Sequence, residues 1–129
     1  MSYDLAIWKR SDRTKTAMLF ECHDAIIEEN SHTAMEFFNE DEFLNGFEEE
    51  FGKRQKGYFG KEIDECPFLF STGTGEFGNW VLMHLNSSTQ QITSNKIIAI
   101  ALKHGLMVYD PQRKAVWGNK KPVKKNKLI

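Results

Sequence analysis

The chain has 129 residues, of which 40% are hydrophobic, and a formal net charge of −1. This length predicts a single domain with a substantial core, and ten Phe and three Trp exclude an intrinsically disordered chain. No apolar run approaches the roughly 20 residues of a membrane span, and early charges exclude a secretory signal, so a cytosolic protein without a membrane partner is expected.

The first predicted element is a strand over residues 3–8, because Tyr3, Leu5 and Ile7 recur at every second position. A short polar break follows. From about residue 14 to residue 29 the apolar residues recur at helical spacing. The chain is therefore expected to begin with a strand and a helix.

A second helix, over residues 40–51, carries the strongest local signals. Asn39 is a good N-cap, and Glu42 lies three residues later, as in a capping box. Four apolar residues at spacings of three and four are expected to form its buried stripe: Phe43, Leu44, Phe47 and Phe51. Either of two glycines can end the helix, and two basic residues can meet its last carbonyl groups: Gly52 or Gly57, and Lys53 and Arg54.

An antiparallel hairpin is predicted in the middle of the chain. Strands at 67–71 and 80–85 are joined by a long Gly-rich connection with its turn at 73–75. The stretch 71–78 superficially resembles a phosphate-binding loop, but it lacks the Lys-Ser/Thr end and joins two strands. We interpret it as a flexible turn.

The third predicted helix begins at Ser87 or Ser88. Gly105 is expected to be the left-handed residue after its last turn, and the next residue to make the apolar contact of a Schellman motif. A strand at 106–109 follows, with residues 114–117 as a short partner beyond an Asp-Pro turn.

The element order β-α-α-β-β-α-β predicts an α+β fold, with one domain over residues 1–118 and helices packed on a mixed or antiparallel sheet. Because the third helix joins two strands directly, these strands are expected to run parallel with a right-handed crossover. Residues 119–129 are interpreted as a basic, disordered tail.

The charges are segregated along the chain. Residues 21–65 contain fourteen Asp and Glu against four Lys and Arg, a balance of −10, whereas residues 113–129 contain seven Lys and Arg and no acid. A concentrated charge steers partners of opposite sign and raises their association rates. Since Phe residues are interspersed in the acidic block, it predicts a surface that meets a basic protein.

Motifs for catalysis and metal binding give weaker signals. The four histidines and two cysteines lack metal-ligand spacing, so no metal or other cofactor is expected. Cys22 and Cys66 have acidic neighbours, which raise a thiol pKa, so both are expected to be unreactive. Cytosolic thiols are normally reduced, and a disulfide between the two is the minority alternative. No catalytic residue is predicted.

Both ends of the chain resemble a family of small bacterial proteins. Residues 2–8, SYDLAIW, are similar to a SYDLAVW-like strand, and residues 104–112, HGLMVYDPQ, are similar to an HGLVCYDPQ-like helix end, strand and turn. The family is associated with immunity proteins of polymorphic toxin and contact-dependent growth inhibition systems. The resemblance covers under a fifth of the chain, and residues 31–65 are more acidic and richer in Phe than the family pattern. It implies a common fold and a cytoplasmic, toxin-binding role.

The leading hypothesis is therefore an immunity protein, rather than an enzyme, that neutralises a cognate toxin. Nuclease-type toxins have basic surfaces because they bind polyphosphate, and carboxylates can mimic that charge. A solvated helix face explains the same carboxylates equally well, and the resemblance favours the binding role. The predicted partner-binding residues are Glu36, Glu40, Asp41, Glu42, Glu48, Glu49, Glu50, Asp64 and Glu65, with Phe37, Phe38 or Tyr58 as apolar anchors.

Two other classes of function stay open. A small enzyme would use Cys22, His23 and the acidic block in a concave pocket with perturbed titrating groups. A nucleic-acid accessory protein would act through the lysines of residues 119–129. No aromatic residue interleaves those lysines, so base stacking is unsupported and a nucleic-acid partner is not favoured.

Overall fold

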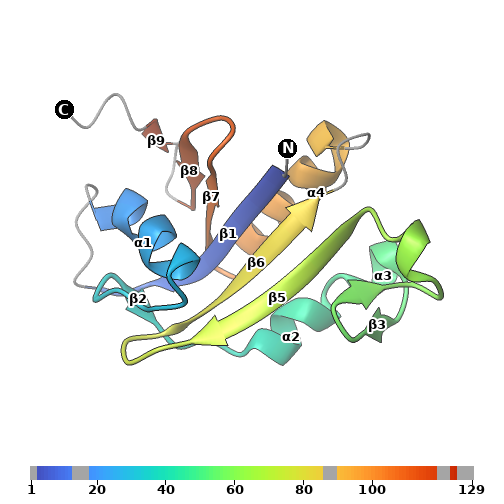
Figure 1. Cartoon of the computed structure of the whole chain (residues 1–129), viewed down its shortest axis with the longest axis horizontal. Helices are drawn as coiled ribbons and strands as arrows, with labels where there is room; N and C mark the ends of the chain where they lie inside the picture. The colour runs from blue at the N-terminus through green and yellow to red at the C-terminus, as the bar shows by residue number, and fades with distance from the viewer. Residues whose placement is uncertain (1–2, 13–17, 86–89, 119–122, 125–129) are drawn as a thin grey trace.

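The computed structural model describes residues 3–12, 18–85, 90–118 and 123–124, and it confirms an α+β fold (Figure 1). A seven-stranded sheet has the order β5-β6-β1-β7-β8-β9, with β2 paired to the end of β1. The strands are β1 (Tyr3–Arg10), β2 (Met35–Glu36), β5 (Phe68–Thr74), β6 (Asn79–Leu85), β7 (Met107–Asp110), β8 (Ala115–Trp117) and β9 (Val123–Lys124).

The first strand of the chain, β1, lies in the middle of the sheet. Its residues Tyr3 to Trp8 pair antiparallel with Leu85 to Trp80 of β6. On its other side it pairs antiparallel with β7, where Ala6 is opposite Tyr109. Because β6 and β7 both run opposite to β1, they run parallel to each other, as predicted for strands joined by a helix.

Helices cover both faces of this sheet (Figure 1). The helix α1 packs against one face, and α2, α3 and α4 pack against the other. The helices are α1 (Met18–Ile27), α2 (Glu40–Asn45), α3 (Glu48–Phe51) and α4 (Gln90–Lys103), with a short 3₁₀ helix η1 (Ile63–Glu65). A small separate hairpin is formed by β3 (Arg54–Gln55) and β4 (Tyr58–Phe59).

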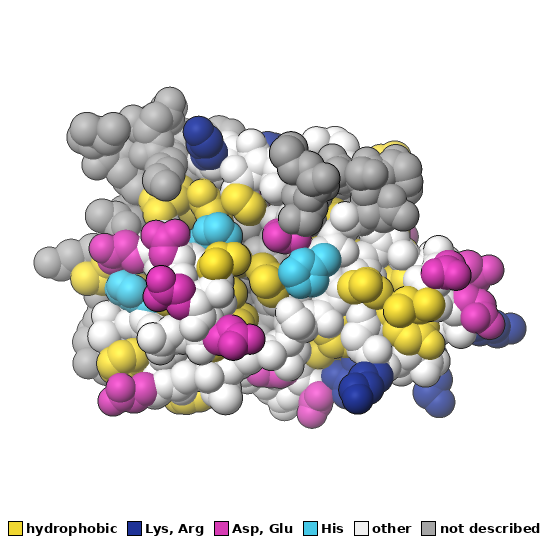
Figure 2. Space-filling model, viewed as in Figure 1, with side chains coloured by type: hydrophobic (Ala, Val, Ile, Leu, Met, Phe, Trp, Pro, Cys, Tyr) yellow, Lys and Arg dark blue, Asp and Glu magenta, His cyan; other side chains and the backbone are white. Residues whose placement is uncertain are grey.

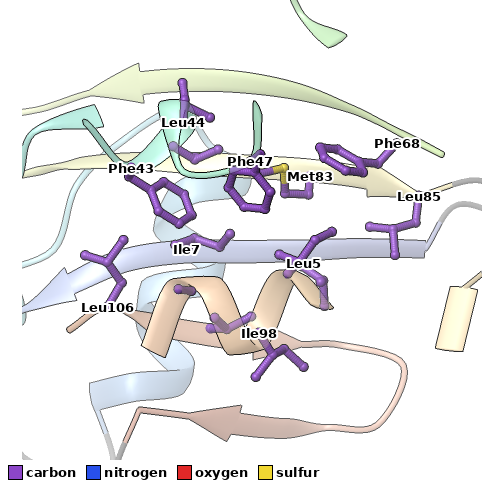
Figure 3. Packing of buried hydrophobic residues seen from close by; sticks show 14 of the residues in the cluster. Leu5, Ile7, Phe43, Leu44, Phe47, Phe68, Met83, Leu85, Ile98 and Leu106 are labelled. Atoms are coloured by element: carbon purple, nitrogen blue, oxygen red, sulfur yellow. The ribbon is translucent and has the colours of Figure 1, made fainter. Parts of the chain in front are cut away.

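Two hydrophobic cores result, one on each face of the sheet. In Figure 3, Phe43 and Phe47 lie over Ile7 and Leu5 of β1. This first core includes Leu5, Ile7, Phe43, Leu44, Phe47, Phe68, Met83, Leu85, Ile98 and Leu106. The second core, beneath α1, includes Ala6, Trp8, Leu19, Phe20, Cys22, Ile26, Trp80, Met107, Tyr109 and Val116. Alternate residues of β1 thus enter opposite cores, as the period of a strand requires.

The predicted helix over 40–51 is correct in position but wrong in being continuous. It is divided into α2 and α3 at Gly46 and Phe47. The amide of Phe47 bonds to the carbonyl of Leu44, three residues back, so the turn is tighter than in an α-helix. The side chain of Phe47 is fully buried. Asn39 caps α2 through a hydrogen bond of 3.1 Å from the amide of Glu42 to Asn39 Oδ1.

The end of α4, which is the third predicted helix, has the Schellman motif that the sequence predicts. Gly105 has φ 71°, and its amide bonds to the carbonyl of Leu102. The amide of Leu106 bonds to the carbonyl of Ala101, so both hydrogen bonds of a Schellman motif are present. The side chain of Leu106 is buried in the first core. The start predicted at Ser87 or Ser88 lies outside the described residues.

The hairpin of β5 and β6 is confirmed, but its turn is displaced. Residues 73 and 74 continue β5, and the connection is formed by residues 75–78. Strands β2, β3 and β4 and the helix η1 were not predicted. The disordered tail predicted over residues 119–129 lies mostly outside the described residues. The described part of this stretch, Val123–Lys124, pairs with β8.

Candidate protein-binding surfaces

The six carboxylates predicted on the second helix lie on α2 and α3, which we call the α2–α3 surface: Glu40, Asp41, Glu42, Glu48, Glu49 and Glu50. Four of them have partners inside the domain. Glu40 Oε1 accepts a hydrogen bond of 2.8 Å from Asn79 Nδ2, and Asp41 Oδ1 lies 3.0 Å from Arg54 Nη1. Glu48 Oε2 accepts from the amide of Arg54 at 3.2 Å, and Glu50 forms an ion pair with Lys96. Much of this charge therefore supports the local structure.

Arg54 corrects a further expectation. It was predicted to meet the last carbonyl groups of the helix, which does end before Gly52. Instead its guanidinium pairs with Asp41 of α2, and its backbone amide binds Glu48 of α3. Arg54 thus links both short helices to β3. The carboxylates of Glu42 and Glu49 are exposed and have no partner within the described part of the chain.

The remaining predicted residues are spread over the molecule. Asp64 and Glu65 are exposed on η1, at the opposite end of the β5–β6 hairpin from its turn. Two predicted anchors, Phe38 and Tyr58, are half-buried and pack against the first core, with Phe38 6.2 Å from the ring of Phe43. Only Phe37 remains as an exposed anchor, with 57% of its surface accessible.

The turn of the β5–β6 hairpin packs against the segment that contains β2. The amide of Phe77 donates a 3.0 Å hydrogen bond to Ser31 Oγ, 46 residues earlier in the chain. One residue beyond the turn, Asn79 Oδ1 accepts from the amide of Phe38 at 2.9 Å, and Asn79 Nδ2 donates to the carbonyl of Phe38 at 3.0 Å. These contacts place residues 36–38 beside residues 76–79.

This packing creates an acidic surface with two aromatic residues, which we call the tip surface: Asp12, Glu36, Phe37, Glu76 and Phe77. Phe37 is 57% exposed and Phe77 is 40% exposed. All but Phe37 line a hollow of about 310 Å³, which Ser11, Thr33 and Met35 complete. Lys9 provides a cation beside this surface, because its Nζ lies 3.1 Å from Glu36 Oε1. The sequence identified Glu36 and Phe37 but missed the other three.

Further carboxylates lie on the outer side of α1. Glu21 and Asp24 are exposed on the helix, and Glu28 and Glu29 are exposed just beyond its end. Glu21 Oε2 lies 3.1 Å from His32 Nε2. Figure 2 shows acidic side chains gathered over the half of the molecule that carries α1 and β2. The tip surface and α1 therefore contribute negative charge to adjacent parts of the domain.

The cysteine and histidine named in the enzyme hypothesis do not form a nucleophilic site. Cys22 is fully buried, and burial, followed by the nearby charge of Glu21, raises the pKa of its thiol to about 12. The ring of His23 packs against Tyr109, with centroids 4.7 Å apart. The thiol of Cys66 donates to the carbonyl of Phe68 at 2.6 Å. Both cysteines are free, and they belong to different cores.

His84, which is outside that hypothesis, also contacts a carboxylate. His84 Nδ1 lies 2.9 Å from Asp4 Oδ1, next to a hollow of about 390 Å³ whose lining includes Leu69 and Ile63. In the described ranges, no group of three or more His, Cys, Asp and Glu residues is arranged to hold a metal. None of the helices that the structure describes has the length and apolar character needed to cross a membrane.

Comparison of the chain with models of protein families, with curated proteins and with solved structures found no match. The resemblance of both chain ends to immunity proteins therefore stays a prediction.

Proposed function

We propose that this chain is an immunity-type protein that binds a basic toxin domain and neutralises it. The observation that carries the proposal is the tip surface, where exposed Phe77 lines one hollow with the carboxylates of Asp12, Glu36 and Glu76. Exposed Phe37 follows Glu36 directly in the chain. Aromatic residues supply much of the binding energy in protein interfaces. Carboxylates around them favour a partner with Lys and Arg at the facing positions.

The proposal moves the main contact away from the α2–α3 surface. There, Asp41 and Glu50 already pair with cations of the same chain, and the paired charges attract an external cation less strongly. At the tip surface only Glu36 has such a pair among the described residues. The hollow bounded by Glu36, Glu76 and Phe77 has the size and charge to receive one Lys or Arg side chain of the partner.

The tip surface alone is too small for a stable complex, since specific interfaces bury roughly 1,000 Å² or more. The exposed carboxylates on and beyond α1, from Glu21 to Glu29, extend the negative surface on the adjacent part of the domain. Such an extended field accelerates association at low salt. Fast capture suits an inhibitor that must act before a lethal enzyme finds its substrate.

The first test is capture of partners from the native host with the tagged chain, at low and at high salt, with identification by mass spectrometry. We expect a single basic protein that is lost at high salt. Expression of the captured protein alone should stop growth of the cells, and coexpression of the immunity-type chain should restore growth. Recovery of nucleic acid, or of a protein whose expression is harmless, would contradict the proposed function.

The second test separates the two acidic surfaces by titration calorimetry with the purified partner. The variants Phe77→Ser and Glu36→Lys/Glu76→Lys should weaken binding at least about 10-fold. The matched control, Glu42→Lys/Glu49→Lys, introduces the same charge change on the α2–α3 surface and should have a smaller effect. If only the control variant loses binding, the toxin contact lies on α2 and α3, as the sequence suggested.

A further inference from the structure

The strand β5 forms one edge of the seven-stranded sheet, with only β6 beside it (Figure 1). Its other side is partly covered, because the amide of Phe70 donates to the carbonyl of Gly57 at 2.9 Å. This bond shows that the N–H and C=O groups of Phe70 point away from β6. In an antiparallel strand the same direction recurs at every second residue, and therefore at Thr72 and Thr74.

No hydrogen bond to these outward groups of Thr72 and Thr74 occurs within the described part of the chain. Natural edge strands are usually protected by Lys, by Pro, by a bulge or by a covering element. Residues 71–74, with the sequence Ser-Thr-Gly-Thr, contain neither Lys nor Pro. Both threonines are β-branched residues with high strand propensity. This part of the edge is therefore suited to receive another strand.

The open edge borders a groove with space for a short strand. The groove has a volume of about 740 Å³ and is lined by α2, by residues 54–57 and by residues 70–72 of β5. Its two ends differ in charge. Glu40 binds Asn79, which is opposite Thr74, and therefore lies at the Thr74 end. Lys56 precedes Gly57 and therefore lies at the Phe70 end.

We propose that this edge binds a second copy of the chain, which pairs β5 with β5 across a two-fold axis. In the register that fits, Gly73 is opposite Gly73 of the second copy, and Thr72 is opposite Thr74. Each such pair exchanges two backbone hydrogen bonds, so the edge makes four. A register centred on Thr72 is excluded, because Thr74 of the second copy would occupy the place that Gly57 takes beside Phe70.

The charges support a second copy rather than an unrelated strand. In antiparallel pairing, the Thr74 end of one copy meets the Phe70 end of the other. The carboxylate of Glu40 in each copy is then directed to the end that carries Lys56 of the other. A two-fold interface is self-complementary by necessity, and a groove with opposite charges at its two ends meets this condition. The inference does not depend on the proposed toxin partner.

Sedimentation velocity of the full chain tests the proposal. Because the edge is short, we expect a monomer at about 1 μM and a dimer at about 1 mM. Thr72→Pro removes one donor per copy, hence two of the four hydrogen bonds, and should weaken association about 30-fold. Proline is tolerated at an edge position whose N–H faces outward. Thr72→Val keeps the amide and should dimerise like the parent chain.

Two further measurements keep the test independent of the folding of the proline variant. Lys56→Glu should weaken the dimer at low salt, whereas Lys53→Glu, an exposed residue outside the groove, should not. Amide exchange of Thr72 and Thr74 should slow as the protein concentration rises. A chain that stays monomeric at the highest concentration, or a dimer that neither Thr72→Pro nor Lys56→Glu weakens, would overturn the proposal.

Discussion

The side chain of Asn79 satisfies both backbone groups of Phe38, although the two residues are 41 positions apart. Its Oδ1 accepts from the amide at 2.9 Å, and its Nδ2 donates to the carbonyl at 3.0 Å. The same Nδ2 also donates to Glu40 Oε1. Asn79 is only 6% exposed, so these bonds are shielded from water. One side chain of β6 thus fixes the segment that leads from Phe37 into α2.

Replacing Asn79 should therefore destabilise the domain. Asn79→Ala leaves the amide and the carbonyl of Phe38 without partners, and we expect a loss of about 2–4 kcal/mol in the free energy of unfolding. Asn79→Asp retains the acceptor but places a second acceptor against the Phe38 carbonyl and Glu40, so it should not rescue stability near neutral pH. Urea unfolding monitored by circular dichroism measures the stability of both variants. A midpoint unchanged in Asn79→Ala would contradict the assigned role.

Truncation of two phenylalanines six positions apart should change the stability of the domain by very different amounts. Phe37 is 57% exposed, so Phe37→Ala should change the free energy of unfolding by less than about 0.5 kcal/mol. Phe43 is 1% exposed in the first core, so Phe43→Ala should cost about 3–5 kcal/mol. Denaturant unfolding of both variants gives the comparison directly. Similar losses for the two variants would mean that Phe37 is not held at the surface.

Gly78 is expected to tolerate no side chain. A Cβ atom there would lie 2.9 Å from the carbonyl oxygen of Glu36 and 2.9 Å from Met35 Cβ. Gly78→Ala should therefore push the hairpin away from β2 and cost about 1–3 kcal/mol in unfolding free energy. Glu76→Ala, in the same connection but exposed, is the matched control and should be nearly neutral. Thermal unfolding that ranks the two variants equally would exclude this close contact.

Alkaline pH should destabilise the protein through Cys22. Burial and the charge of Glu21 raise the pKa of this thiol from its ordinary value of 9.0 to about 12. Between these values the unfolded chain loses the proton while the folded chain keeps it, so stability is complete below pH 9 and falls above it. The slope is at most about 1.4 kcal/mol per pH unit.

Comparison with Cys22→Ala isolates this effect. Burial, Asp24 and Asp110 also raise the pKa of Tyr109, but Tyr109 is present in both proteins. Urea midpoints measured from about pH 8 to about pH 10.5 should therefore fall more steeply for the parent chain than for the variant. Parallel curves would show that the Cys22 thiol titrates normally in the folded state.

The correctly predicted elements are those whose signals are local. The cap at Asn39 and the glycine at position 105 act within one turn of their helices, so a few neighbouring residues are enough to identify them. The two-residue strands could not be predicted in this way. Met35 and Glu36 form β2 only because Arg10 and Lys9 are opposite them, and no local pattern encodes that pairing.

The tip surface also combines residues that the sequence identifies locally with residues that long-range contacts bring into place. Glu36 and Phe37 belong to the acidic, Phe-rich block that the sequence displays directly. Phe77 lies in the Gly-rich connection that was interpreted as a flexible turn, and its position depends on the bond to Ser31. The internal partners of Glu40 and Asp41 come from β6 and β3. A charge count along the chain cannot distinguish such carboxylates from those available to a partner.

The central position of β1 also determines when this protein can fold during its synthesis. The strand β1 is synthesised before both of its partner strands, which end at Leu85 and Asp110. Translation at about 5–20 residues per second delays β7 by roughly 5–20 seconds. Before β7 is made, β1 can pair with β6, but the edge of β1 that β7 later covers stays open. The centre of the sheet is therefore complete only after β7 has been made.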